Sequence, residues 1–183
     1  MVKIIPAILT EDWEEFVARF DEVKSMVNRV QLDVGDGKFI DTVTVAPEDL
    51  NEIDTAVKLD AHLMVEEPAE WLDRCLQGGF SRVFGHIEKM GDVAKFIAQA
   101  ELRGFEVGLA LDVNTPVGEI EEYIWNIDGL LLLSVNAGKS GQEFNDSVLK
   151  KIKEVEKLRD DIPVVVDGGL SENEIKECLT ARW

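Results

Sequence analysis

Residues 31–39 read QLDVGDGKF, a stretch that begins as a buried strand and then turns polar. Asp33 and Asp36 occupy positions where a core strand would carry valine or leucine. A carboxylate in an apolar interior is costly unless it is paired, hydrogen-bonded or bound to a metal. The stretch therefore indicates a strand whose end carries functional side chains, with Gln31 close to the first acid.

Short apolar runs of the same kind recur along the whole chain. Runs such as GLLLLSV and PVVVD are rich in branched residues, which is typical of strands covered on both faces. We expect strands at residues 3–9, 29–34, 58–64, 82–86, 106–111, 129–134 and 163–167.

Amphipathic segments lie between these runs. Pro68 and Pro116 suit the first turn of a helix, Ser171 with Glu174 forms a capping box, and Gly104 suits a helix end. A spacing of 3.6 residues predicts helices whose apolar faces cover a sheet. These faces contain Trp13, Phe16, Val17, Phe20 and Val23, then Val93, Phe96, Ile97 and Ala100, and later Val148, Leu149, Ile152, Val155 and Leu158.

The strands begin at intervals of about 25 residues, which indicates a repeated strand–helix unit. Such repeats predict an α/β fold with a parallel sheet and outer helices, and an even ring of this kind is a TIM barrel of eight units and ~250 residues. Seven units fit within residues 1–183. We therefore expect one barrel domain over residues 1–183 whose eighth strand–helix unit is missing through truncation at the C-terminus.

Composition narrows the classes of partner. The 183 residues carry a net charge of −18, which argues against nucleic acid and anionic membranes. The apolar run at residues 130–133 is far shorter than the ~20 residues that a membrane span needs. Two cysteines, Cys75 and Cys178, form no disulfide framework, which favours the cytoplasm.

Polar residues gather at the predicted carboxyl ends of the strands, where TIM barrels carry their active sites. Both histidines of the chain are among them, and this clustering is more informative than any single residue. The set comprises Gln31, Asp33, His62, His86, Glu88, Asp112, Asn114, Ser134, Asn136 and Asp167.

Two glycine-containing motifs follow late strands. In VVVDGGLSENE, residues 164–174, Gly168 and Gly169 together with a capped helix would suit an anion, although a tight strand-to-helix turn explains the glycines equally well. SVNAGKSGQ, residues 134–142, would grip a phosphate or cover a site, and a flexible surface loop is the alternative.

Taken together, the chain resembles the ribulose-phosphate 3-epimerase family of ribulose-phosphate-binding barrels. Seven stretches match in family order, at family spacing and over essentially the whole chain. They are IIPAIL (4–9), QLDVGDGKFI (31–40), DAHLMVEEP (60–68), HIE (86–88), ALDVNTP (110–116), SVNAGKSGQEF (134–144) and VVVDGGLSENE (164–174).

The resemblance implies an isomerase that interconverts D-ribulose 5-phosphate and D-xylulose 5-phosphate by inversion at C3. It implies Asp33 and Asp167 as the catalytic acid and base, because inversion needs one group on each face of the carbon. It also implies a divalent cation (Zn, Fe, Mn, Co or Mg) held by Asp33, His62 and Asp167, with the position of Gln31 as the fourth ligand. A homo-oligomer is compatible with the family. The residues implied in substrate binding are Ala7, His62, Gly138, Lys139, Ser140, Gly141, Gly168 and Gly169.

Several positions depart from the family pattern. Gln31 stands where the family has a metal-binding histidine, which predicts weaker binding or a harder metal such as Mg or Mn. Ala7 replaces a serine and Gly35 replaces a methionine, and both changes predict a larger pocket. Lys139 and Ser140 differ from the family's glycine loop, where Lys139 would add positive charge near the phosphate.

Two alternatives follow from these departures. One is a 3-epimerase of another ketose phosphate, such as a hexulose 6-phosphate. The other is a non-catalytic protein that binds sugar phosphates. Related barrels that decarboxylate or condense sugar phosphates carry an Asp-x-Lys pair on the third strand, and His62 in place of that lysine counts against them.

Overall fold

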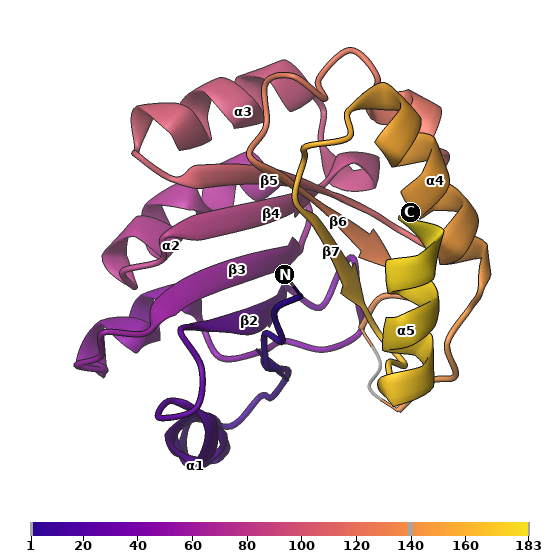
Figure 1. The fold of residues 1–183 in the computed structure, drawn as a ribbon. Coiled ribbons are helices and arrows are strands. Elements are labelled where there is room, and N and C mark those ends of the chain that lie inside the picture. The colour runs from indigo at the N-terminus through magenta and orange to yellow at the C-terminus, as the bar shows by residue number, and fades with distance from the viewer. Residues whose placement is uncertain (1, 139–140, 183) are drawn as a thin grey trace.

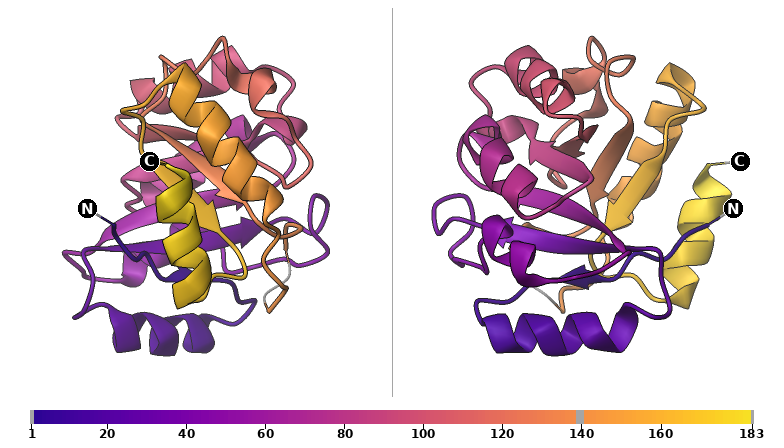
Figure 2. Two further views of the ribbon diagram at one scale, coloured as in Figure 1. Left: turned by 45° about the vertical axis from the view of Figure 1, so that its right-hand side comes forward. Right: turned by 90° about the vertical axis from the view of Figure 1, so that its left-hand side faces the viewer.

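A computed structural model describes residues 2–138 and 141–182 and places seven parallel strands in one sheet, in the order β1 to β7. The sheet curls, and the helices cover its outer face, as Figures 1 and 2 show. The strands are β1 (Ala7–Ile8), β2 (Arg29–Gly35), β3 (Lys58–Met64), β4 (Arg82–His86), β5 (Glu106–Leu111), β6 (Gly129–Leu133) and β7 (Val164–Asp167). The α-helices are α1 (Trp13–Val23), α2 (Leu72–Gln77), α3 (Val93–Leu102), α4 (Ser147–Leu158) and α5 (Glu172–Ala181).

The predicted α/β barrel architecture is confirmed as a curled, incomplete barrel of parallel strands. The predicted bounds of β3, β4 and β5 agree with the structure residue for residue. The first strand is much shorter than predicted, because only Ala7 and Ile8 pair with β2. Pro6 precedes them and has no N–H to donate to a ladder, so it confines the strand to its last residues.

Local signals explain the ends of the helices. Asp12 caps α1 and Asp92 caps α3, each by accepting a backbone N–H in the first turn. Ser171 and Glu174 form the predicted capping box at the start of α5. These caps satisfy donors that a helix would otherwise leave without a partner.

Two connections differ from the regular strand–helix repeat. Only the 3-10 helix η1 (Pro47–Glu52) lies between β2 and β3, and only the 3-10 helix η4 (Val117–Ile120) lies between β5 and β6. Pro116 was expected inside the first turn of an α-helix, but it precedes η4. Both segments lack a sustained apolar repeat, and tight 3-10 turns serve such short connections. Two further short 3-10 segments are η2 (Pro68–Trp71) and η3 (Ile87–Lys89).

The interior of the curled sheet is filled in layers. Phe84 is fully buried and packs with Ala110, Leu131 and Leu133 on the inner face. Gly108 makes this possible, because a Cβ atom there would lie 2.1 Å from the Phe84 ring. Toward the amino ends of the strands, an ion-pair network closes the interior, so the open polar end is the one at the carboxyl ends.

That network centres on Asp60, which is fully buried on β3. Its carboxylate accepts hydrogen bonds from both Arg29 and Arg82. Arg29 also donates to both carboxylate oxygens of Glu106, at 2.9 and 3.0 Å. The charges of this network therefore compensate one another across four strands.

Within residues 2–138 and 141–182, the structure contains no helix that is both long enough and apolar enough to cross a bilayer.

Candidate active site

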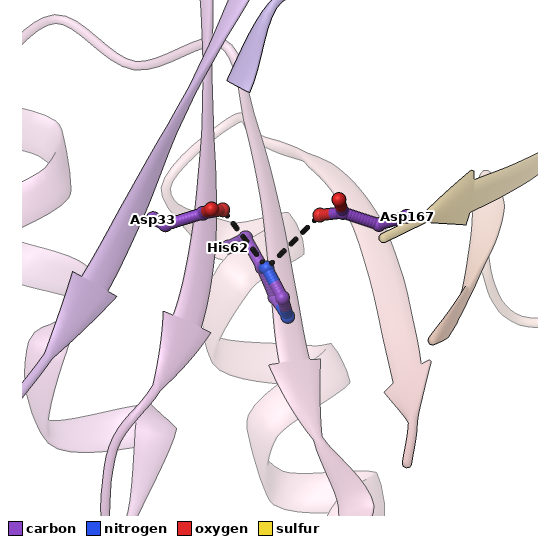
Figure 3. A group of neighbouring side chains, drawn as sticks. All are labelled: Asp33, His62 and Asp167. Atoms are coloured by element: carbon purple, nitrogen blue, oxygen red, sulfur yellow. Dashed lines mark hydrogen bonds and ion pairs between the residues drawn. The ribbon is translucent and has the colours of Figure 1, made fainter. Parts of the chain in front are cut away.

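Three of the predicted site residues meet at the carboxyl ends of the strands. Asp33 on β2 lies beside His62 on the neighbouring β3, and Asp167 reaches them from β7. Figure 3 shows the two carboxylates pointing toward one another with His62 between them. The Nδ1 atom of His62 lies 3.0 Å from Oδ1 of Asp33 and 3.5 Å from Oδ2 of Asp167.

Gln31 joins the same group and is 2% exposed. Its Nε2 atom donates to Oδ1 of Asp33 at 2.8 Å and to Oδ2 of Asp167 at 2.7 Å. Ala7 on β1 is the register partner of Gln31. The amide therefore bridges the two carboxylates, which answers why a glutamine stands beside Asp33.

The surroundings shift the pKa values of Asp33 and Asp167 in opposite directions. Burial raises the pKa of Asp33, and the hydrogen bonds from His62 and Gln31 only partly offset it. Burial acts in the same sense on Asp167, but the contact with His62 and the bond from Gln31 outweigh it and lower its pKa. Pairs whose pKa values are pushed apart are suited to act as acid and base.

Burial by itself lowers the pKa of His62, but the contacts with Asp167 and Asp33 outweigh it and raise the pKa to about 9. An imidazolium so placed compensates the carboxylates when no other cation is present.

The donor set fits a divalent cation. Asp33, His62 and Asp167 each offer one ligand atom, and these atoms lie within 4.8 Å of one another. Two carboxylate oxygens and one imidazole nitrogen are donors that Zn, Fe and Mn accept. Rotation of the Gln31 amide by 180° would turn its oxygen toward the same centre, and amide orientations are assigned from the hydrogen-bond network.

A second layer of polar groups stands behind His62. Its Nε2 atom lies 2.9 Å from Nε2 of His86, and Nδ1 of His86 lies 3.0 Å from Oε2 of Glu88. The backbone N–H of Asp112 donates to the other oxygen of Glu88 at 2.8 Å, and Lys151 donates to the Asp112 carbonyl. The position of His86 and Glu88 at the rim agrees with the sequence, but their connection to His62 was not foreseen.

Lys151 was also missed, although the sequence held a signal for it. It lies between Val148 and Val155 on the buried face of α4, where a lysine is unusual. A charged residue within an apolar helical face indicates a polar partner in the interior.

Asp36, the second acid of the opening stretch, has a local structural task. Its Oδ1 atom accepts from the N–H groups of Lys38 and Phe39, and its Oδ2 atom accepts from that of Glu66. Burial raises its pKa, but these backbone hydrogen bonds outweigh that effect and lower it. Asp36 thus fixes the loop after β2 against the loop after β3.

The prediction that Gly35 enlarges a pocket is wrong. A Cβ atom at Gly35 would lie 2.5 Å from both the Ile40 side chain and the Thr42 carbonyl. The loop after β2 folds back and Ile40 fills this space. The prediction of a larger substrate pocket therefore rests on Ala7 alone.

Three of the predicted glycines lie in tightly packed turns, whereas a Cβ atom added at Gly141 would meet nothing within 4 Å. Gly168 and Gly169 have positive φ angles of 105° and 62°, and added Cβ atoms would contact Val135 and Phe144. Gly138 also has a positive φ and packs on Ile40. Lys139 and Ser140, predicted to bind substrate, lie outside the described residues. The roles of all these positions in substrate binding stay predictions.

The raised pKa of His62 predicts a pH-dependent stability of the metal-free protein. His62 has a pKa of about 9 in the folded chain and about 6.5 when unfolded. Its stabilising contribution is fully present below pH 6.5 and is lost as the pH rises through 9. We expect urea unfolding in EDTA to give a lower free energy at pH 9.5 than at pH 6. His62→Asn should flatten this difference, and a slope unchanged by that substitution would contradict the assignment.

Comparison with known proteins provides independent findings. The sequence model described as the ribulose-phosphate 3 epimerase family matches residues 3–182. A ribulose-phosphate 3-epimerase of Bacillus subtilis is 33% identical, over 94% of this chain and 83% of the relative. One of Schizosaccharomyces pombe is 32% identical, over 92% of this chain and 77% of the relative.

Solved structures support the fold alone. A mutant tryptophan synthase α-subunit of Pyrococcus furiosus superposes with a TM-score of 0.66 at 12% identity, over 98% of this chain and 82% of that one. The resemblance extends across the sheet and its outer helices.

Proposed function

This chain belongs to the ribulose-phosphate 3-epimerase family, and we propose that it interconverts D-ribulose 5-phosphate and D-xylulose 5-phosphate. The observation that carries the proposal is the facing pair Asp33 and Asp167, with His62 and Gln31 in contact with both carboxylates. The assignment of the enzyme to the isomerases follows from the same family membership. We place the protein in the cytoplasm, because one relative from rice is named a cytoplasmic isoform.

In this proposal the two carboxylates act on opposite faces of C3. Asp167, whose pKa is lowered, is ionised and takes the proton, while the electron pair of the C–H bond moves into the neighbouring carbonyl and forms an enediolate. Asp33, whose pKa is raised, returns its own proton to the other face of C3. The roles of the two residues exchange in the reverse direction.

A divalent cation would be held by Asp33, His62 and Asp167, with the Gln31 oxygen as a fourth donor. When bound, such an ion stabilises negative charge on the oxygens of the enediolate as a Lewis acid. The contribution of the chain itself is to hold the two carboxylates at fixed positions. With its amide oriented as in the structure, Gln31 does so by donating one N–H to each of them, and the turned amide would instead offer its oxygen to the ion.

We place the phosphate of the substrate at Gly168 and Gly169, directly before α5. Support comes from their positive φ angles and from the helix start that follows, a position that favours anions. A cavity of about 590 Å³ is lined by Leu9, Thr10, Glu11, Asp12, Glu15, Thr42 and Gly138. Its three acidic residues do not suit a phosphate, so we place the phosphate at the glycines before α5 and not in this cavity.

Deuterium exchange tests the proposal. The chain is incubated with D-ribulose 5-phosphate in D₂O, and NMR follows both label at C3 and the appearance of D-xylulose 5-phosphate. We expect both. Binding of the sugar phosphate without label or conversion would overturn the proposal in favour of a non-catalytic binding protein.

Gln31→His should tighten binding of Zn²⁺ by about tenfold or more, because an imidazole replaces an amide at a position that contacts both carboxylates. Calorimetric titration of the metal-free protein measures the effect. Asn114→His is the matched control, because Asn114 is an exposed residue of the same rim. Equal affinities of the Gln31→His protein and the wild type would show that position 31 does not face the ion.

A further inference from the structure

We propose that His86 and Glu88 are positioning residues that fix the ring orientation and tautomer of His62, so that Nδ1 of His62 always faces Asp33 and Asp167. The inference rests on the proposed function, because it gives the pair a task in the same reaction. Neither residue contacts the carboxylates of the site among the interactions described above. In this proposal they act on the carboxylates by holding His62 in place.

Geometry provides the first step. Glu88, His86 and His62 form a continuous series of contacts, with Glu88 Oε2 3.0 Å from Nδ1 of His86 and the two Nε2 atoms 2.9 Å apart. His62 is 1% exposed and His86 is 0% exposed. Polar groups this deeply buried are costly unless each one is hydrogen-bonded, so the order of donors and acceptors is constrained.

The chemistry of Glu88 fixes that order. An ionised carboxylate only accepts hydrogen bonds, so Nδ1 of His86 must carry the proton and donate it. A neutral His86 then has a lone pair on Nε2, which accepts from Nε2–H of His62. The second nitrogen of His62, Nδ1, faces the two carboxylates at 3.0 and 3.5 Å and is free to bind a cation or a proton there.

Further contacts hold this series in place. The N–H of Asp112 donates to Oε1 of Glu88 at 2.8 Å, so the carboxylate is fixed on both sides. Phe39 packs its ring against His86 edge to face, with centroids 4.8 Å apart. The His86 ring therefore has little freedom to turn. A group behind a metal-binding histidine that sets its tautomer typically accounts for 10- to 100-fold in affinity or activity.

Two substitutions at one position separate this role from simple packing. His86→Leu removes both polar contacts. His86→Gln retains them in principle, because the amide oxygen can accept from His62 and the amide nitrogen can donate to Glu88. We expect kcat to fall about 10- to 100-fold in His86→Leu with KM nearly unchanged, and to be largely restored in His86→Gln.

Mn²⁺ affinity, measured by calorimetry on the metal-free proteins, provides a readout that does not depend on catalysis. We expect the dissociation constant to rise about 10- to 100-fold in His86→Leu and much less in His86→Gln. Ser81→Ala is the matched control, because it removes a hydrogen bond to the Leu59 carbonyl at the opposite end of the β3–β4 pair. It should leave the affinity as in the wild type.

The ring nitrogens of His62 report the tautomer directly. The chain has two histidines, so in either His86 variant the only histidine signal belongs to His62. In the Zn²⁺-loaded His86→Gln protein, ¹H–¹⁵N spectra should show a proton on Nε2 and none on Nδ1.

Wild-type kcat and Mn²⁺ affinity in His86→Leu would overturn the inference, as would a folded His86→Gln protein that is no better than His86→Leu. If the wild type gives no exchange at C3, the proposed reaction fails. The Mn²⁺ and NMR measurements still decide whether His86 and Glu88 position His62, so the two failures are distinguishable.

Discussion

Asp33→Asn and Asp167→Asn are each expected to lower the rate of conversion between the two pentulose phosphates by about 10²- to 10⁴-fold, the usual contribution of a general acid or base. Asparagine keeps the shape of the side chain but can neither take up nor give the proton. Inversion at C3 needs one group on each face, so the loss of either carboxylate slows conversion. NMR in D₂O measures conversion and exchange in the same sample.

Exchange without conversion would make this test more informative. A remaining carboxylate can still remove and return a proton on its own face, so each variant can label only one of the two epimers. The labelled epimer then identifies which carboxylate faces it. Asp41→Asn is the matched control, because Asp41 is exposed in the loop after β2. Conversion at the wild-type rate in either Asp33→Asn or Asp167→Asn would refute the proposed roles.

Asp60→Ala is expected to lower the free energy of unfolding by about 3–5 kcal/mol, because removing one partner of a buried ion pair leaves an uncompensated charge. Asp60 is fully buried and accepts from both Arg29 and Arg82. Its loss would leave two guanidinium groups facing each other within the closed end of the barrel. Urea unfolding at pH 7 measures the change.

Asp73→Ala provides the control for this second experiment. Asp73 forms an ion pair with Arg103 at 2.7 Å, but its side chain is 70% exposed, and solvent screens such pairs. Little change in stability is expected there. A further variant, Asp60→Leu with Arg82→Met, should recover part of the loss, since apolar groups can replace a buried ion pair. If Asp60→Ala unfolds at the same urea concentration as the wild type, the network does not stabilise the fold.

Much of the fold could be predicted because its strands are buried on both faces. The segments 58–64, 82–86 and 106–111 were predicted as strands, and the structure has strands with those bounds. The connection from β2 to β3 was harder. It contains a 3-10 helix beginning at Pro47 in place of an α-helix, and no apolar repeat marks its geometry.

The candidate site was predictable in position but not in its hydrogen bonds. Strand ends place Asp33, His62 and Asp167 at one rim, since parallel strands end on the same side. The bond from Gln31 to Asp167 joins residues 136 positions apart and depends on how strongly the sheet curls. The filling of space at Gly35 by Ile40 likewise depends on the return of a loop. Local patterns carry no information on either.

The amide of Gln31 connects the second strand of the sheet to its last strand. Strands β2 and β7 are not neighbours in the ladder, so this side chain spans the interior rather than extending the backbone pairing. The curvature of the sheet and the distance between the carboxylates of Asp33 and Asp167 therefore depend on each other. A substitution that flattens the sheet would move the two carboxylates apart. Conversely, a ligand that draws the carboxylates together would increase the curvature of the sheet.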